Sequence, residues 1–225
     1  MSEQLIFDLK TRPALKRGDF FISDSNALAL AMIEDCENWP QNKHLLIGPK
    51  GSGKTHLANV WANQRGTRVI AAKDIIDQSV EENAAHDLVI DDIPEILGDT
   101  SREATLFHVH NLCLANGNAL LMTGTGDLAA WICALPDLAS RLNGTRTARL
   151  DPPDDMLFQA LLAKLFADRQ LFPPPDVFPY LLLRLERSYD AAQNAVHHID
   201  RAALSRKRAI TRSFVASLID ELIKA

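Results

Sequence analysis

A glycine-rich segment followed by a lysine and a threonine carries the clearest chemical signal in the sequence. It fits the pattern G-x-x-x-x-G-K-[ST], and its residues are Gly48, Pro49, Lys50, Gly51, Ser52, Gly53, Lys54 and Thr55. Glycines let backbone N–H groups turn inward around an anion, and a helix N-terminus adds partial positive charge. Lys54 would reach the β- and γ-phosphates of a nucleotide, and the Thr55 hydroxyl would ligate Mg²⁺. The segment therefore predicts a phosphate-binding P-loop.

The residues on both sides of this segment favour the same interpretation. An apolar run at 44–47 predicts a buried strand, and residues 56–62 predict a helix. His56 follows the motif directly, and we include it in the expected nucleotide site. The alternative is a glycine-rich turn without a ligand, which would not require this order of strand, loop and helix.

A second apolar run, at 88–90, ends in the acidic pair Asp91 and Asp92. A carboxylate at the end of a strand beside a P-loop can hold Mg²⁺ directly or through water, and we expect Asp91 to do so. Asp92 could polarise the attacking water, but it is one methylene shorter than the glutamate common at such positions. We therefore expect weak hydrolysis, or hydrolysis only in a complex. Alternatively, the pair caps the next turn.

Two further positions have polar groups that could act on a phosphate. The strand predicted at 119–122 leads to Thr123 and Thr125, and a hydroxyl there could face the γ-phosphate. An ordinary strand-end turn explains these threonines equally well. Arg141 lies in a helical, mostly apolar setting. An arginine that reaches a neighbour's phosphate stabilises transition-state charge, although an ion pair within the chain explains Arg141 equally well.

Composition sets broad limits on the class of protein. The 225 residues suit one large domain, or a domain with a smaller lid. No stretch approaches the ~20 apolar residues of a membrane helix, and the N-terminus does not resemble a signal peptide. The three cysteines have no metal-site spacing, so we expect buried free thiols in a reducing cytoplasm. The net charge of −5 argues against broad DNA binding but allows a local basic patch.

The order of the predicted elements indicates the fold class. Strands alternate with helices up to about residue 150, which implies a parallel sheet covered on both faces. The strands are expected at 45–47, 69–72, 88–90, 119–122 and 148–150, and helices at 25–36, 55–64 and 101–116. Residues 152–225 then predict a small all-helical module. Its first expected helix carries an apolar stripe from Phe158 to Phe166. Two further helices are expected at 177–187 and 190–206, followed by a last helix capped by Thr211.

Together these residues resemble the AAA+ ATPase superfamily, and within it the branch of the replication initiator DnaA. Residues 53–57 resemble that branch's GKTHL, and residues 88–93 resemble its LLIDDI. Residues 106–108 with Asn111 resemble its FFH-x-x-N helix, and residues 140–142 its SRF element. The resemblance covers about residues 18–222. It implies a P-loop AAA+ αβα sandwich with a five-stranded parallel sheet over 13–151, followed by a helical lid over 152–225.

Two departures from DnaA narrow the resemblance. The chain ends after the lid, which leaves no segment for a helix-turn-helix DNA-binding domain. The first residues resemble a sliding-clamp-binding peptide over residues 1–12, with Gln4, Leu5, Phe7 and Leu9 at the matching positions. Alone, such a peptide is common, and a disordered start is the alternative. Both departures are similar to the Hda family of DnaA regulatory inactivators.

The resemblance implies a cytoplasmic regulator of replication initiation. Such a protein binds ADP or ATP with Mg²⁺, sits on the DNA-loaded clamp (the polymerase III β subunit) and stimulates hydrolysis of the ATP bound to DnaA. Arg141 would be the arginine finger supplied in trans, and intrinsic hydrolysis would be weak or absent. A homo-oligomer is possible, whereas membrane contact and strong direct DNA binding are not expected. The alternatives are an ATP-driven helicase loader and an initiation-promoting adaptor.

The lid departs from the family pattern. The family senses nucleotide with a lid arginine, and that place falls on Asp190 in this sequence. Arg187 lies one turn earlier and is the expected substitute at the nucleotide. A basic cluster follows, which could contact DNA or DnaA or form a solvated helix face; its members are Arg201, Arg206, Lys207, Arg208 and Arg212.

Overall fold

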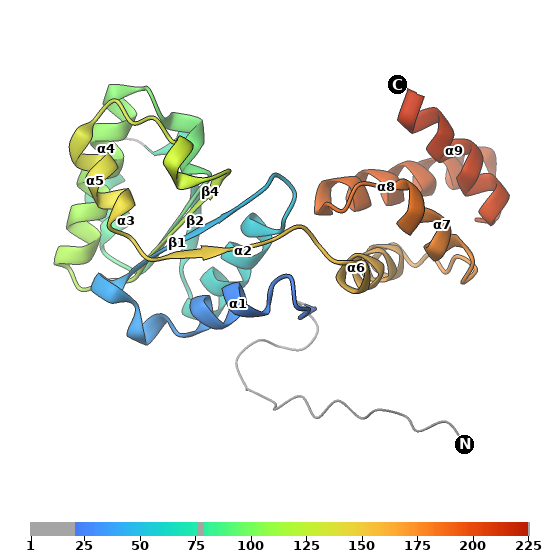
Figure 1. The fold of residues 1–225 in the computed structure, drawn as a ribbon, viewed down its shortest axis with the longest axis horizontal. Helices are drawn as coiled ribbons and strands as arrows, with labels where there is room; N and C mark the ends of the chain where they lie inside the picture. Colours follow the sequence, from blue (N-terminus) through green and yellow to red (C-terminus); the bar gives the residue numbers. More distant parts are fainter. Residues whose placement is uncertain (1–20, 76–78, 225) are drawn as a thin grey trace, which may run out of the picture.

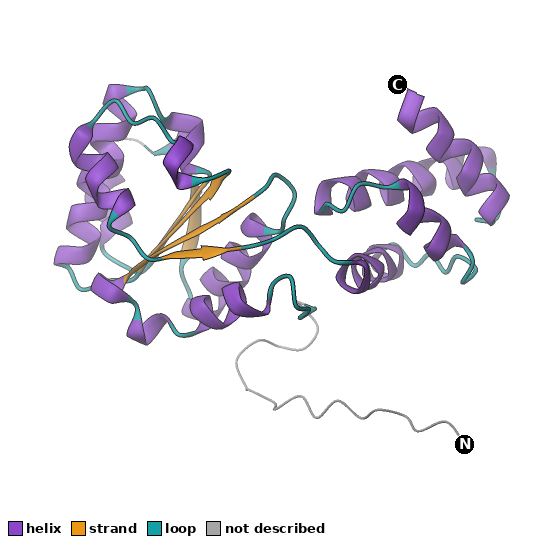
Figure 2. Ribbon diagram, viewed as in Figure 1, coloured by secondary structure: helices purple, strands orange, loops and turns teal. Residues whose placement is uncertain are grey.

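The computed structural model describes residues 21–75 and 79–224. The predicted clamp-binding positions Gln4, Leu5, Phe7 and Leu9 lie outside these residues. Two parts follow each other along the chain, a sheet covered by helices and a group of helices without strands (Figures 1 and 2). No helix in the described part of the chain combines the length and apolar character that a membrane span needs.

The sheet has five parallel strands in the order β2-β3-β4-β1-β5. The strands are β1 (Lys43–Gly48), β2 (Arg68–Ala71), β3 (Leu88–Asp91), β4 (Leu120–Thr125) and β5 (Thr147–Arg149). In register, Gly48 of β1 faces Thr125 of β4, so the carboxyl ends of these strands lie side by side. The sequence-based prediction of a five-stranded parallel sheet is confirmed.

Helices cover both faces of this sheet (Figure 2). Leu46 packs on one face with α1 (Ala27–Glu34) and α2 (Lys54–Arg65). Leu45 and Ile47 pack on the other face with three helices, α3 (Val80–Ala84), α4 (Thr100–Ala115) and α5 (Pro136–Asn143). Successive residues of a strand point to opposite faces, so continuous apolar runs are needed where both faces are buried.

Four helices form the second part of the chain around a core of their own, which includes Phe158 and Phe166. They are α6 (Asp155–Asp168), α7 (Val177–Arg184), α8 (Tyr189–Arg206) and α9 (Arg212–Lys224). Side chains cap three of them: Asp154 accepts from the Leu157 N–H, Ser188 from Ala191 and Thr211 from Phe214. The predicted cap at Thr211 is confirmed, and each cap satisfies an N–H that the helix leaves unpaired.

Some details differ from the sequence-based predictions. The helix predicted to reach residue 187 ends at Arg184, because Leu185 has an extended backbone and Arg187 donates to the carbonyls of Leu182 and Leu185. The short helix α3 was not predicted. All three cysteines are free, but only Cys113 is buried.

Candidate nucleotide-binding site

The predicted P-loop connects β1 to α2. Gly51 and Gly53 have φ angles of 71° and 94°, in the left-handed region that glycine adopts without strain. A side chain at Gly48 would also collide with the loop, since its Cβ would lie 2.4 Å from the Leu150 carbonyl oxygen and 2.7 Å from Ser52 Oγ. Glycine is therefore required at these positions for the loop to take this shape.

Lys54 begins α2 and turns its ammonium group into the loop. Its Nζ donates to the carbonyl oxygens of Gly48 at 3.0 Å and Pro49 at 2.8 Å. The side chain is buried, which lowers the pKa of Lys54, while the nearby carboxylates of Asp92, Asp91 and Asp190 raise it. No ion pair among the described residues involves Lys54. A buried cation that contacts only carbonyl groups there is suited to receive an anionic phosphate.

Ser52 provides a direct test of whether the loop fits a phosphate. The residue is 4% exposed, and its hydroxyl has no hydrogen-bond partner within the described residues. A buried hydroxyl without a partner is costly, and phosphate oxygens would supply the missing acceptor. Together with the ammonium group of Lys54, this hydroxyl shows that the residues present fit the phosphates of a nucleotide.

The expected Mg²⁺ residues lie together at the carboxyl end of β3. Thr55 Oγ1 donates to Asp91 Oδ2 at 2.9 Å, and Thr123 Oγ1 donates to Asp91 Oδ1 at 2.5 Å. Within the described chain, no group of three or more histidine, cysteine or acidic residues is placed so that it could hold a metal ion by itself. Mg²⁺ in nucleotide sites usually takes only one or two carboxylates, with water and phosphate oxygens completing its shell. Thr55 and Asp91 therefore suit that role when a nucleotide is bound.

Asp92 has an unusual backbone and an altered acidity. Its φ of 58° is left-handed, a conformation that non-glycine residues rarely adopt outside functional sites and turns. Its N–H donates to Thr123 Oγ1 at 3.0 Å, which ties it to the neighbouring strand. Burial raises the pKa of Asp92, as do Glu95 and Asp91, whereas Lys54 and a backbone hydrogen bond from Thr125 lower it. A raised pKa makes a carboxylate a better proton acceptor, so the direction suits the predicted role.

The start of α8 lies directly against the P-loop (Figure 1). The Tyr189 N–H donates to the Gly51 carbonyl at 2.6 Å, and a Cβ on Gly53 would lie 2.9 Å from the Tyr189 ring. Burial raises the pKa of the Tyr189 hydroxyl to about 12. The Tyr189 and His56 rings are 6.5 Å apart between centroids. Sequence analysis did not identify Tyr189; its only signal was its place beside Asp190.

Arg187 points into the lid. Its Nε lies 2.7 Å from Asp155 Oδ1, and its guanidinium group lies over the Phe158 ring, 5.3 Å from the centroid. These contacts join the start of α6 to the segment before α8. The exposed Asp190, by contrast, lies beside Gly51. The role of Arg187 at the nucleotide stays a prediction, and the contacts of its side chain are with residues of the lid.

Arg141 lies at the opposite edge of the sheet from the P-loop. Its carbonyl accepts from Lys43 Nζ at 3.3 Å and from Thr145 Oγ1 at 2.7 Å. Lys43 begins β1, whereas the P-loop follows the last residue of that strand, about 17 Å away at the usual rise per residue. Arg141 is exposed, and none of the ion pairs in the described chain involves it. Among the described residues, no hydrogen bond or ion pair joins Arg141 to another predicted site residue.

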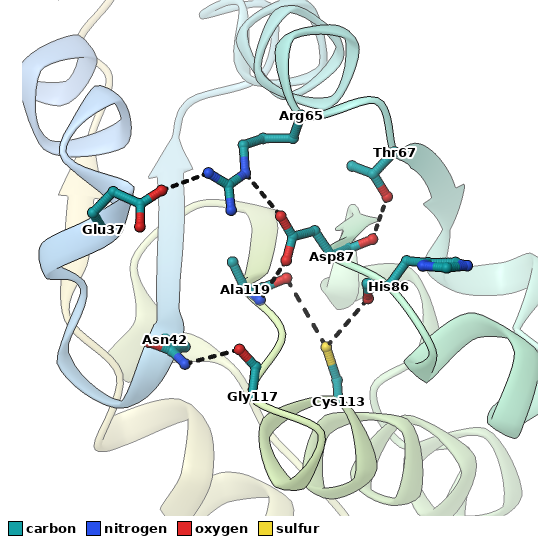
Figure 3. Close-up of polar contacts among 9 residues, drawn as sticks. All are labelled: Glu37, Asn42, Arg65, Thr67, His86, Asp87, Cys113, Gly117 and Ala119. Carbon is teal, nitrogen blue, oxygen red and sulfur yellow. Dashed lines mark hydrogen bonds and ion pairs between the residues drawn. The ribbon is translucent and has the colours of Figure 1, made fainter.

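A second polar cluster, around Asp87, lies at the amino end of β3 (Figure 3). Asp87 accepts from Arg65 Nε and from the Ala119 N–H, each at 2.8 Å. Arg65 also donates to Glu37 at 2.7 Å, and hydrogen bonds to Asp87 and Glu37 raise the pKa of Arg65 above its ordinary value. Every group in this cluster contacts another protein group, which indicates that it holds elements together.

The fold and the site define a class of protein: a P-loop chain of the AAA+ type, with an αβα sandwich followed by a helical lid. Solved structures of this class are similar over most of the chain. Domain III of the Thermotoga maritima replication initiation protein DnaA matches with a TM-score of 0.82 at 19% identity, covering 95% of this chain and 99% of that one. Aquifex aeolicus DnaA bound to AMPPCP matches with a TM-score of 0.69 at 19% identity, covering 88% and 69%.

A further solved structure has a similar fold. The Thermotoga maritima RuvB Holliday junction branch migration motor matches with a TM-score of 0.62 at 17% identity, covering 80% of this chain and 61% of that one. An uncharacterized protein of Haemophilus influenzae is 26% identical over 211 residues, 89% of this chain and 91% of its own length. No family model matches the sequence. At these identities the likeness establishes the fold: the chain has the AAA+ fold of the DnaA group, as its motifs predicted.

Proposed function

We propose that the chain is a nucleotide-binding regulator of DnaA, of the kind found in the Hda family. In this proposal, residues 13–151 form the nucleotide-binding domain and residues 152–225 its lid. The P-loop binds ADP or ATP, with Thr55 and Asp91 holding Mg²⁺. Residues 1–12 attach the protein to the DNA sliding clamp, and the protein acts in the cytoplasm on ATP-bound DnaA. Hydrolysis by its own site is weak or absent.

The placement of Arg141 carries this proposal. An arginine finger must reach a phosphate, and Arg141 is exposed at the edge of the sheet opposite its own P-loop. The exposed guanidinium group can therefore reach only a phosphate held by another molecule. An arginine finger supplied in this way raises phosphoryl-transfer rates by roughly 10³–10⁵ in related systems. The alternative explanation for Arg141 is an ion pair within the chain. No carboxylate of the described residues forms an ion pair with Arg141.

The lid contact supports a small role for the protein's own catalysis. Where the family places an arginine for sensing nucleotide, this chain has Asp190, which adds a negative charge near Lys54. A carboxylate beside the phosphate site opposes the added charge of a γ-phosphate. Asp92 supports the same conclusion, since its short side chain reaches less far than a glutamate.

A reconstituted DnaA ATPase assay, with and without DNA-loaded clamp, tests the proposal. We expect stimulation that requires both the clamp and this protein. Arg141→Ala should abolish the stimulation and leave nucleotide binding intact. Arg146→Ala is the matched control, because Arg146 is also an exposed arginine in the same region. Equal loss in both variants, or no loss in either, would contradict a finger role for Arg141.

Two further measurements separate this proposal from its alternatives. Removal of residues 1–9 should abolish capture by the clamp in a pull-down, and unchanged capture would exclude the proposed attachment. Substantial ATP turnover by the isolated protein, lost in Lys54→Ala, would instead indicate an ATP-driven loader. A site that retains no nucleotide on purification would favour an adaptor.

A further inference from the structure

A strongly basic region lies at the end of the lid away from the P-loop, where α8 ends and α9 begins (Figure 1). Residues 201–219 contain five arginine or lysine residues and no acidic residue. The other 206 residues carry 19 cations and 29 acidic groups, a net charge of −10. The chain is therefore acidic overall, and the total charge conceals the opposite sign of this region.

The structure brings arginines from three elements together in this region. The guanidinium groups of Arg184 from α7 and Arg212 from α9 both lie over the Tyr180 ring, at 5.2 and 5.9 Å from its centroid. Arg208, from the loop between α8 and α9, lies over the Phe214 ring at 5.7 Å. All three arginines are exposed. We call the surface formed by Arg184, Arg206, Lys207, Arg208 and Arg212 the basic end of the lid.

Helix stability explains only part of this charge. Arg206 and Lys207 lie at the C-terminus of α8, where the helix dipole favours cations. Arg212 is the first residue of α9, at the positive end of the dipole, and the first turn of that helix contains no acidic residue. A cation is unfavourable there. Arg208 belongs to neither helix, and its ring contact with Phe214 does not neutralise its charge.

The backbone of the same loop is also strained. Lys207 has a φ of 47°, in the left-handed region, at a helix end where glycine is usual. Strained backbone and clustered positive charge in one short segment are features that sequences keep at functional sites. An external anion would relieve the electrostatic part of this cost.

We propose that the basic end of the lid binds the phosphate backbone of DNA. Duplex DNA has about one negative charge per 1.7 Å of its axis, all of one sign, which is complementary to the five cations of the basic end of the lid. Four of its five cations are arginines, whose planar guanidinium groups form paired hydrogen bonds with phosphate oxygens. A protein partner would usually bury an interface centre that is depleted of charged residues. Such binding does not read base sequence, and it is separate from the proposed action on DnaA.

Charge reversal at two arginines tests this proposal. We expect Arg208→Glu/Arg212→Glu to weaken binding of a fluorescent 30-base-pair duplex by at least about tenfold at low salt. The slope of log affinity against log salt should decrease by about 2, because each lost phosphate contact removes about 0.9. The control variant Lys73→Glu/Arg102→Glu makes the same change in net charge on exposed residues outside the lid. The affinity of this control variant for the duplex should fall by no more than about threefold, since only the long-range attraction between protein and DNA changes.

Two outcomes would overturn the proposal. Equal losses in the two double variants would show that net charge alone governs binding. Binding of a polyglutamate peptide as tightly as the duplex would assign the surface to an acidic protein instead. Thermal unfolding shows whether the double variant is folded. Arg212→Glu places an acidic group at the start of α9, where the helix dipole favours negative charge, so the Tm should be unchanged or higher. If the double variant unfolds, Arg208→Ala and Arg212→Ala measured singly should each weaken duplex binding by about threefold, and unchanged binding in both would overturn the proposal.

Discussion

Two aspartates border the same short strand, and their surroundings differ. Asp87 comes just before β3, and Asp91 is its last residue. Asp87 contacts a guanidinium group and a backbone N–H (Figure 3). Among the described residues, Asp91 accepts from the hydroxyl groups of Thr55 and Thr123 alone. The first carboxylate is thus neutralised by the protein, whereas no ion pair within the described residues involves the second.

The difference shows that the two edges of the sheet, the amino edge where the strands begin and the carboxyl edge where they end, have different roles. A carboxylate with a cation and an N–H as partners holds elements together, because moving it would leave the buried Ala119 N–H without an acceptor and would remove one of the two carboxylates that Arg65 contacts. Threonine hydroxyl groups can turn their protons elsewhere and offer oxygen lone pairs to a metal. The carboxyl edge therefore keeps groups available for a ligand, and the amino edge uses its groups for stability.

The largest expected effect is on nucleotide binding at the carboxyl edge. Asp91→Ala should lower the Mg²⁺-dependent affinity for nucleotide by about 100-fold, since a metal ligand and its hydrogen bonds are lost. The free energy of unfolding should fall by about 1 kcal/mol, because the exposed Thr55 hydroxyl can bond to water and only the buried Thr123 hydroxyl loses its acceptor. Isothermal titration with and without Mg²⁺ measures the first effect. Affinity that does not depend on Mg²⁺ in either protein would contradict the assignment of Asp91.

The reverse pattern is expected at the amino edge. Asp87→Ala should lower the free energy of unfolding by about 2 kcal/mol, because Arg65 and the Ala119 N–H lose their shared acceptor. Nucleotide affinity should stay within about threefold of the unchanged protein, since the site is at the other edge. Urea denaturation measures the loss, and Asp87→Asn, which keeps an acceptor oxygen, is the control. A loss as large in Asp91→Ala would remove the distinction between the two edges.

Stability should also fall as the solution becomes mildly acidic. Burial, followed by the charge of Arg146, lowers the pKa of His44 to about 4. Burial also lowers the pKa of His110 to about 4; a hydrogen bond with Asn111 raises that pKa, and the charges of Lys43 and Arg141 lower it. Both histidines bind protons near their ordinary pKa of about 6.5 when unfolded, so the unfolded state gains protons first on acidification. Stability is therefore kept above about pH 6.5 and lost between that value and about pH 4.

Between pH 7 and 6 we expect a loss of about 1 kcal/mol in the free energy of unfolding. Denaturation curves at both pH values measure it. His44→Phe with His110→Leu should flatten the dependence, since neither replacement titrates. An unchanged slope in that variant would assign the effect to other groups.

The smallest expected effect concerns the lid contact. Asp190→Asn removes a negative charge near Lys54 and should raise the affinity for ATP by about threefold to tenfold. The gain should be larger for ATP than for ADP, because the terminal phosphate adds charge. Asp176→Asn is a control on an exposed aspartate in the lid that is distant in sequence from α8. Equal gains in both variants would indicate a general effect of charge.

Sequence reasoning predicted the elements well because their signals are local. The apolar runs, the cap at Thr211 and the helical part after residue 152 were all predicted from neighbouring residues. The cluster around Asp87 was not predicted, since nothing nearby in the sequence marks an aspartate whose partners come from α2 and from the residue before β4. The contact of Tyr189 with the P-loop was missed for the same reason.

The sequence alone determined the P-loop, because eight adjacent residues set its backbone shape and the polar groups that it presents. Tertiary structure decided which other groups reach it. Thr55 and Thr123 lie 36 and 32 residues from Asp91, and only the parallel order of β1, β4 and β3 brings the three side chains within hydrogen-bond distance. It also placed Arg141 beside Lys43, at the opposite end of β1 from the P-loop. Strand order and register depend on packing across the whole sheet, and no local segment contains that information.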